Sequence, residues 1–191
     1  MDLVIIAKDY SGKNVKLLAE KIGKWNNISV VESSSDDSVQ ISDECEFVIA
    51  SVDPKVREEE FTALKEKNAK LAVLVHPQSY VNPATQIGEG CIVMQGVIVY
   101  DDSTLCDNVL LMEYSSVSHD SIVGSHAVLM EKVTVAGHGH VGKGALLSAN
   151  TVVKETVKIL DGAVCEPGSV VMSDVAEDTI VAGNPARIKR H

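Results

Sequence analysis

An aliphatic residue recurs every six positions from Val75 to Val171, and no insertion breaks this register. Sixteen of the seventeen members of the series are Val, Ile or Leu, and the remaining one is Cys165. A smaller residue stands two positions before the next member, as Ser79 does before Val81. Side chains two positions apart point to the same side of a strand. A short fixed period of this kind is typical of a solenoid.

A turn in each hexad would close three hexads into a triangular coil of eighteen residues. Aliphatic side chains would then stack on those of the next coil, at the strand spacing of about 4.8 Å. A single coil cannot bury its own inner face, so the stack has to supply the core. Residues 75–176 are therefore predicted to form a prism of slightly under six coils. Ordinary sandwich strands are disfavoured, because they require irregular spacings and longer turns.

Residues 1–74 have a different pattern, which predicts a small α/β domain with a mostly parallel sheet. Short apolar runs alternate with segments of helical spacing, and Pro54 is well placed at the start of a helix. Residues 177–191 are expected to form a C-terminal tail. The predicted strands span 3–7, 28–31, 47–50 and 71–75, and the predicted helices span 12–25 and a segment from Pro54 onward.

The composition excludes several classes of partner. A net charge of −10 argues against nucleic acid or an anionic membrane surface. No wholly apolar run is longer than the five residues of 71–75, which is too short to span a bilayer. The N-terminal run lacks a basic region and a cleavage site, so we expect no signal peptide.

The cysteines have no paired spacing for zinc, and we expect reduced thiols in a cytoplasmic protein. They are Cys45, Cys91, Cys106 and Cys165.

One corner of the predicted prism concentrates reactive groups. Residues eighteen apart stack at a corner, which places Asp101 one coil below His119 and Gly137 one coil above it, with Asp120 alongside. A carboxylate beside an imidazole raises its pKa and orients it as a base. The Gly137 N–H would be an oxyanion donor, which completes a layout for acyl transfer. His138 would stack over Asp120, where it would either take part or only neutralise the carboxylate.

The N-terminal unit has a second candidate site. In a parallel α/β sheet the ligand crevice lies beyond the carboxyl ends of the strands. Ser11, Gly12 and Lys13 would follow the first strand and open a helix, whose N-terminus attracts phosphate. The loop does not match G-x-G-x-x-G. A plain strand-to-helix turn and a nucleotide-sugar site therefore both remain open at this point.

The whole chain resembles the left-handed β-helix acyltransferases. The resemblance is closest to bacterial sialic acid O-acetyltransferases and nucleotide 4-amino-sugar N-acetyltransferases. It is carried by the N-terminal α/β unit, the uninterrupted hexapeptides, the segment A-G-N-P-A-R at 182–187, and V-S-H-D at 117–120. The resemblance implies a left-handed β-helix and a homotrimer, with active sites between neighbouring prisms and acetyl-CoA as co-substrate.

The resemblance also implies roles for individual residues. His119 matches the catalytic base, and Asp120 matches the acidic residue that supports it. Gly137 matches the glycine that contacts the acetyl carbonyl. Asp101 is assigned to binding of the acceptor sugar. Ala149, Pro167 and Gly168 fall along the pantetheine and adenine portions, while Ser11, Gly12, Lys13 and Asp53 match the nucleotide-sugar loops.

Three positions depart from the pattern of these enzymes. Their N-terminal loop usually reads G-A-G-G-H-G, whereas residues 9–14 here read D-Y-S-G-K-N. A second histidine of the family, nine residues after the base, is Val128 here, with His126 nearby. An asparagine seven residues before the base, which helps to hold the sugar, is Met112.

The sequence therefore predicts an acetyl-CoA-dependent acetyltransferase with His119 as general base and no metal. Its acceptor would be a nucleotide sugar or a sialic acid-type molecule in surface-glycan biosynthesis, acetylated on nitrogen or oxygen. One alternative is a binding or scaffold protein with degraded chemistry. Another is a γ-type carbonic anhydrase, for which His119, His138 and His140 would have to bind zinc. The N-terminal unit and the A-G-N-P-A-R segment fit that second alternative poorly.

Overall fold

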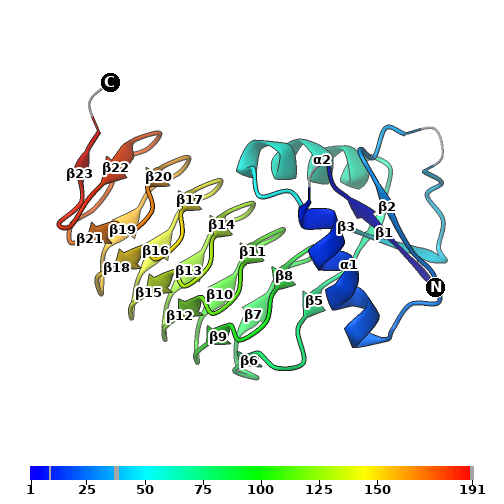
Figure 1. Cartoon of the computed structure of the whole chain (residues 1–191), viewed down its shortest axis with the longest axis horizontal. Helices are drawn as coiled ribbons and strands as arrows, with labels where there is room; N and C mark the ends of the chain where they lie inside the picture. Colours follow the sequence, from blue (N-terminus) through cyan, green and yellow to red (C-terminus); the bar gives the residue numbers. More distant parts are fainter. Residues whose placement is uncertain (9, 37–38, 190–191) are drawn as a thin grey trace.

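The computed structural model describes residues 1–8, 10–36 and 39–189 of the chain. The molecule is elongated, with an N-terminal α/β unit at one end and a stack of short-stranded coils that runs to the C-terminus (Figure 1). None of the helices in the described part of the chain is long and apolar enough to cross a membrane.

The coils contain seventeen strands of two residues each, and every strand ends on a member of the six-residue series. The prediction from the hexads is thereby confirmed, strand by strand. The strands are β5 (Leu74–Val75), β6 (Tyr80–Val81), β7 (Gln86–Ile87), β8 (Ile92–Val93), β9 (Ile98–Val99), β10 (Thr104–Leu105), β11 (Leu110–Leu111), β12 (Ser116–Val117), β13 (Ile122–Val123), β14 (Val128–Leu129), β15 (Thr134–Val135), β16 (His140–Val141), β17 (Leu146–Leu147), β18 (Val152–Val153), β19 (Lys158–Ile159), β20 (Val164–Cys165) and β21 (Val170–Val171).

These strands form three parallel sheets, one on each side of the prism. The sheet orders are β19-β16-β13-β10-β7, β21-β18-β15-β12-β9-β6 and β20-β17-β14-β11-β8-β5, and two C-terminal strands extend the third sheet beyond β20. Each residue pairs with the one eighteen positions on, as Ser116 does with Thr134 and Val117 with Val135. The second residue of each strand points inward, and Val117, Val135 and Val153 are fully buried there. Cys91 and Cys165 are also fully buried, as the register predicts.

The N-terminal unit is a four-stranded parallel sheet with one helix on each face. The sheet order is β2-β1-β3-β4. The prediction of a single strand over 71–75 is wrong, because the chain leaves one sheet and enters the next within this segment: β4 pairs with β3, whereas β5 pairs with β8 of the prism. The elements are β1 (Asp2–Ile6), α1 (Ser11–Ile22), β2 (Ile28–Val31), β3 (Cys45–Ile49), α2 (Pro54–Glu66) and β4 (Lys70–Leu71).

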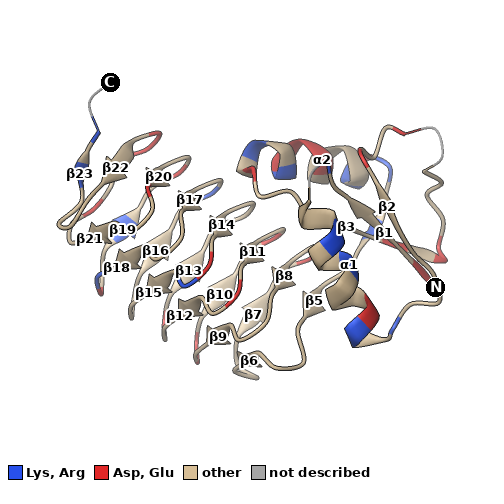
Figure 2. Cartoon of the chain, in the orientation of Figure 1, with Lys and Arg blue, Asp and Glu red and all other residues tan. Residues whose placement is uncertain are grey.

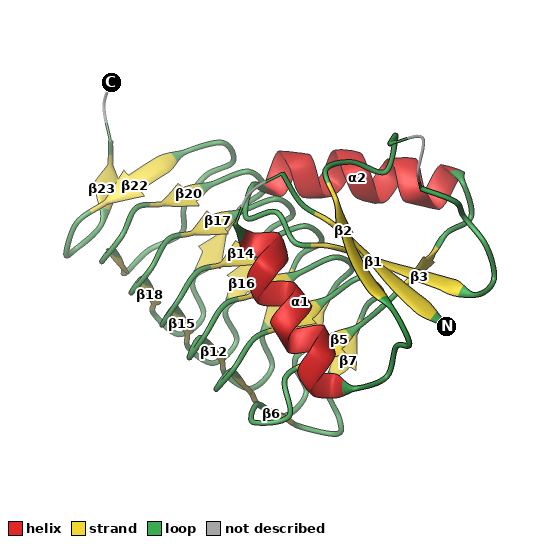
Figure 3. Ribbon diagram, turned by 45° about the vertical axis from the view of Figure 1, so that its right-hand side comes forward, coloured by secondary structure: helices red, strands yellow, loops and turns green. Residues whose placement is uncertain are grey.

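The N-terminal unit packs on the sheet that contains β5, β8 and β11, which we call the docked sheet. In this sheet the outward side chains are apolar as well, and α1 lies against them (Figure 3). Val15 and Leu18 of α1 belong to the same buried cluster as Ile92 and Leu110 of the prism. Helix α2 covers the opposite face of the N-terminal sheet, where Leu64 joins Phe47.

Arg57 joins α2 to the prism from a fully buried position. Its guanidinium donates to the main-chain oxygens of Ile49, Ser51 and Asn108, and also to Asn108 Oδ1 at 2.7 Å. Burial lowers the pKa of Arg57 to about 9. The Asn108 amide in turn donates to Arg57 O at 2.9 Å and to His126 Nδ1 at 3.0 Å. The buried cation is thus held by oriented carbonyl groups that come from both parts of the molecule.

The described part of the C-terminal segment closes the last coil with a hairpin. Strand β22 (Ile180–Ala182) pairs in parallel with β20 and antiparallel with β23 (Arg187–Ile188). The A-G-N-P-A-R segment forms the turn of this hairpin, with a cis peptide bond before Pro185.

Replacement of Arg57 by Leu is expected to lower the free energy of unfolding by about 3 kcal/mol, because four oxygens would lose their donor in a buried place. Urea unfolding followed by the fluorescence of Trp25, the single tryptophan of the chain, measures the change. Lys55→Leu on the exposed side of the same helix is the control. Equal unfolding midpoints for the two variants would contradict the expected role of Arg57.

Candidate active site

His119 and Asp120 form the turn between β12 and β13 at one corner of the prism, here called the His119 corner. The turns at 101–102 and 137–138 lie directly below and above this one. Asp120 N–H donates to Asp101 O at 3.1 Å, and His138 N–H donates to His119 O at 3.0 Å. The stacking that the sequence predicts at this corner is therefore present, with one main-chain hydrogen bond between neighbouring turns.

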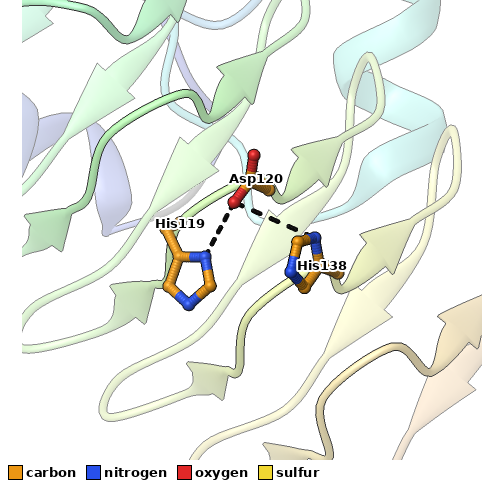
Figure 4. Close-up of side chains that lie close together, drawn as sticks. All are labelled: His119, Asp120 and His138. Carbon is orange, nitrogen blue, oxygen red and sulfur yellow. Dashed lines mark hydrogen bonds and ion pairs between the residues drawn. The ribbon is translucent and has the colours of Figure 1, made fainter.

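The side chain of Asp120 orients the imidazole of His119. Nδ1 of His119 lies 2.8 Å from Asp120 Oδ2 (Figure 4). An ionised carboxylate can only accept, so Nδ1 carries the hydrogen of this bond. The lone pair of neutral His119 is therefore on Nε2. This tautomer is the one that a general base requires, with the supporting carboxylate on the far side of the ring.

Both partners of this pair have shifted pKa values. The hydrogen bond to Asp120 raises the pKa of His119, and the charges of Asp120 and Asp101 act in the same direction. The same hydrogen bond lowers the pKa of Asp120, and the charge of His138 contributes to that shift. The side chains are 54% and 47% exposed, so solvent screens these charges while leaving the imidazole open to a substrate.

Gly137 provides the space in which the His119 ring lies. A Cβ atom at position 137 would stand 2.7 Å from His119 Nε2 and 2.8 Å from Cε1, closer than real side chains approach. The main-chain oxygen of Gly137 accepts from Thr156 N–H. Among the described residues no acceptor pairs with the Gly137 N–H. A donor beside the base nitrogen suits the stabilisation of a developing oxyanion.

His138 lies on the other side of Asp120. Its Nδ1 is 3.9 Å from Asp120 Oδ2, and its ring stands edge-on to that of His119 with centroids 5.1 Å apart. His140 is the first residue of β16 and is not a member of this group. Within one chain, the described residues therefore do not bring the three histidines that a carbonic anhydrase would need to one place.

The predicted coenzyme residues follow a different corner of the prism. Ala149 and the Pro167–Gly168 turn are stacked, with the Gly168 N–H donating to Ala149 O at 2.9 Å. Gly168 has φ 72°, a left-handed conformation that favours glycine. These residues form one column, but that column does not include His119.

An open cavity of about 790 Å³ lies between the N-terminal unit and the prism, beside the start of α2. Its volume lies in the range of small-molecule sites. Charges of both signs line it, and most charged residues of the chain belong to helices, turns and loops (Figure 2). Lys143 forms an ion pair with Glu58 there at 2.6 Å. The charged lining residues are Asp53, Lys55, Glu58, Lys143, Asp161, Glu177 and Asp178.

Asp53 lines this cavity, but the structure also gives it a local role that the sequence analysis did not predict. Its side chain caps α2 by accepting from the main-chain N–H groups of Lys55 and Val56, at 2.9 and 3.5 Å. Removal of such a cap costs about 1 kcal/mol. A substitution at this position would therefore change stability as well as any contact to a ligand.

Ser11, Gly12 and Lys13 open α1, as expected, but they are not among the residues that line the cavity. Gly12 is buried, and a Cβ atom there would stand 2.7 Å from Ala7 Cβ and 2.9 Å from Val30 Cγ1. Close packing of helix on sheet therefore explains this glycine without a ligand. Asp9 of the same loop lies outside the described residues.

Two of the three departures from the pattern of these enzymes, Val128 and Met112, lie between the prism and the N-terminal unit. Val128 is fully buried and Met112 is 9% exposed, and both belong to the apolar cluster between α1 and the docked sheet. His126 does not replace the missing histidine, because its Nδ1 is occupied by Asn108 and burial lowers its pKa. These positions hold the two parts of the chain together.

Several acetyltransferases of known structure have a similar fold. The acetyltransferase domain of PglB from Neisseria gonorrhoeae matches with a TM-score of 0.91 at 23% identity, over 98% of this chain and 99% of that one. PerB from Caulobacter crescentus, solved with CoA and GDP-perosamine, matches with a TM-score of 0.89 at 24% identity, over 100% and 98%. This chain has the fold of these acetyltransferases. The resemblance inferred from the sequence is thereby confirmed at the level of the fold.

A more distant match is WeeI from Acinetobacter baumannii, with a TM-score of 0.67 at 16% identity over 99% of each chain. The PglB domain was also solved in complex with acetyl coenzyme A. Variants of the Caulobacter enzyme in which one histidine is replaced by alanine or asparagine are among the similar structures. No family model and no curated protein matches the sequence.

Replacement of Asp120 by Asn is expected to lower the pKa of His119, because the hydrogen bond to the carboxylate is the largest cause of its rise. Titration of the imidazole C–H signals by NMR measures the shift. Glu155→Gln changes a charge at the same corner, two coils above Asp120, and is the control. An unchanged His119 midpoint in the Asp120 variant would show that the pair does not form in solution.

Proposed function

We propose that this chain transfers an acetyl group from acetyl-CoA to the amino group of a nucleotide-linked amino sugar. The observation that carries the proposal is the geometry of the His119 corner, where an oriented base and an unpaired main-chain N–H lie side by side. The comparisons support the co-substrate and the acceptor class, since similar structures were solved with acetyl coenzyme A and with CoA and GDP-perosamine. They also favour acetylation of nitrogen over oxygen.

In the proposed reaction the acceptor amine attacks the carbonyl carbon of the thioester. Nε2 of His119 takes a proton from the amine as the new bond forms, and Asp120 stabilises the resulting imidazolium. The Gly137 N–H donates to the oxygen that becomes negative. Collapse of this intermediate breaks the C–S bond and releases CoA with a proton. The products are the N-acetylated sugar and free CoA.

The cavity beside α2 is the place that we propose for the nucleotide sugar. Lys55 would face the phosphates there, and Lys143 would have to exchange its ion pair with Glu58 for a phosphate. None of the described residues that line this cavity belongs to the His119 corner. An acceptor bound in the cavity would therefore need His119 from a second copy of the chain. This separation supports the homotrimer with sites between prisms, which stays a prediction, as does a role in surface-glycan biosynthesis.

Replacement of His119 by Ala is expected to lower kcat by about 10²–10⁴-fold, the usual contribution of a positioned base. The assay follows CoA release from acetyl-CoA with GDP-perosamine and other nucleotide amino sugars as acceptors. His140→Ala, in β16 of the next coil and outside the His119 corner, is the matched control. Wild-type turnover by the His119 variant would refute the assignment. Absence of acetyl-CoA binding to the wild-type chain would favour a scaffold protein instead.

The rate is expected to rise with pH, because only neutral His119 can accept the proton. The pKa of His119 is raised, so half-maximal kcat/KM should lie above pH 6.5, the ordinary value for histidine. In Asp120→Asn the midpoint should move to lower pH while the plateau falls. A pH profile of kcat/KM for both proteins checks this. A wild-type rate that falls as pH rises through this region would contradict base catalysis by His119.

A further inference from the structure

Three possible metal ligands converge at the His119 corner. One nitrogen from His119, one from His138 and a carboxylate oxygen of Asp120 all lie within 4.8 Å of one another. Asp120 Oδ2 is 2.8 Å from His119 Nδ1 and 3.9 Å from His138 Nδ1 (Figure 4). In a tetrahedral site with bonds of about 2.1 Å, neighbouring ligand atoms stand about 3.4 Å apart. The two distances bracket this value, so small side-chain rotations would bring all three atoms to bonding distance.

The main chain holds these side chains in place. His119 and Asp120 share one turn, and His138 lies on the turn directly above, joined to it by the hydrogen bond from His138 N–H to His119 O. The two turns belong to neighbouring coils of the rigid prism. A metal ion would therefore meet donors that are already assembled, and little ordering of the chain would oppose binding.

The donor set fits a particular class of ion. Two imidazoles and one carboxylate are borderline ligands of the kind that bind zinc in catalytic sites with an open position. The three side chains are 54%, 47% and 60% exposed, which leaves room for water to complete the coordination. Calcium and magnesium prefer sets made only of oxygen atoms and are disfavoured here.

We propose that His119, Asp120 and His138 bind a divalent transition-metal ion such as Zn²⁺, and that the bound ion inhibits acetyl transfer. The inhibitory part rests on the proposed function, whereas binding of the ion does not. This site differs from that of a carbonic anhydrase, because the ion replaces the proton between His119 and Asp120 and does not serve the reaction.

Inhibition follows from the tautomer of His119. As a base, the ring carries its hydrogen on Nδ1 and its lone pair on Nε2. Coordination of the metal uses the lone pair of Nδ1, so a neutral ring must then carry its hydrogen on Nε2. That nitrogen can no longer accept a proton from the acceptor amine. The ion also takes the carboxylate oxygen of Asp120 that stabilises the imidazolium.

Binding is tested by calorimetry with Zn²⁺ on the untagged full-length chain, together with the absorption spectrum of the Co²⁺ complex. We expect one ion per chain with micromolar affinity and the visible bands of tetrahedral cobalt. His138→Ala should weaken binding by more than about tenfold, while His140→Ala should bind as the wild type does. Absence of binding, or equal affinity in the His138 variant, would overturn the proposal.

Inhibition is tested by acetyl transfer at increasing Zn²⁺, with each rate expressed relative to the metal-free rate of the same protein. We expect the wild type to lose activity over the concentration range in which calorimetry shows binding, and to recover it on addition of EDTA. His138→Ala should need more than about tenfold more zinc. Binding without inhibition would overturn the tautomer argument. If the chain transfers no acetyl group at all, the proposed function fails, and calorimetry still decides the metal site.

Discussion

The stacking of one inward aliphatic side chain per strand is the constraint on which the rest of this structure depends. A strand of two residues contributes a single buried side chain, so no strand is stable without the coils above and below it. Each inward position pairs with its equivalent eighteen residues away, as Val117 does with Val135. Because the strands pair at this spacing, the turns at the corners also stack eighteen residues apart. The strand pairing, and not a local motif, therefore places Asp120 beneath His138 and His119 against Gly137.

A second level of organisation is the junction between the N-terminal unit and the prism. The docked sheet is apolar on its outer face where α1 covers it, and α2 is tied to the corner at Asn108 through the buried Arg57. The guanidinium has main-chain oxygens and one amide as its described partners. A buried charge is costly to leave unpaired, so the N-terminal unit has to dock where Asn108 meets Arg57. The junction therefore depends on these polar contacts as well as on apolar packing. It fixes the position of the cavity beside α2.

Much of this arrangement could be predicted from residues that recur in register. The strand ends, the sheet pairing and the column through Asp101, His119 and Gly137 all follow from counting. The docking face was also visible in principle, because Leu74, Ile92, Leu110 and Val128 form an outward apolar column that the other two sheets lack. The role of Arg57 was not predictable, because it depends on contacts between segments that share no period. The Asp53 cap is local, and the signal that could have found it is an Asp directly before Pro54. For Gly12, which the resemblance assigns to the nucleotide sugar, the contact with Ala7 and Val30 is a second reason for a glycine, and this contact shows no period in the sequence.

The spacing of eighteen residues per coil also governs how such a chain can change in length. Gain or loss of one complete coil would shift everything beyond it by one strand spacing, about 4.8 Å, and would leave every corner in phase. A change of six residues would keep the core intact but would move the following turns to the next corner of the prism. The inward aliphatic side chains would still stack after either change. If the change fell between Asp101 and His138, only the first would keep the groups of the His119 corner on a common edge. Within that stretch the chemistry therefore restricts the length of the chain more tightly than the packing of the prism core does.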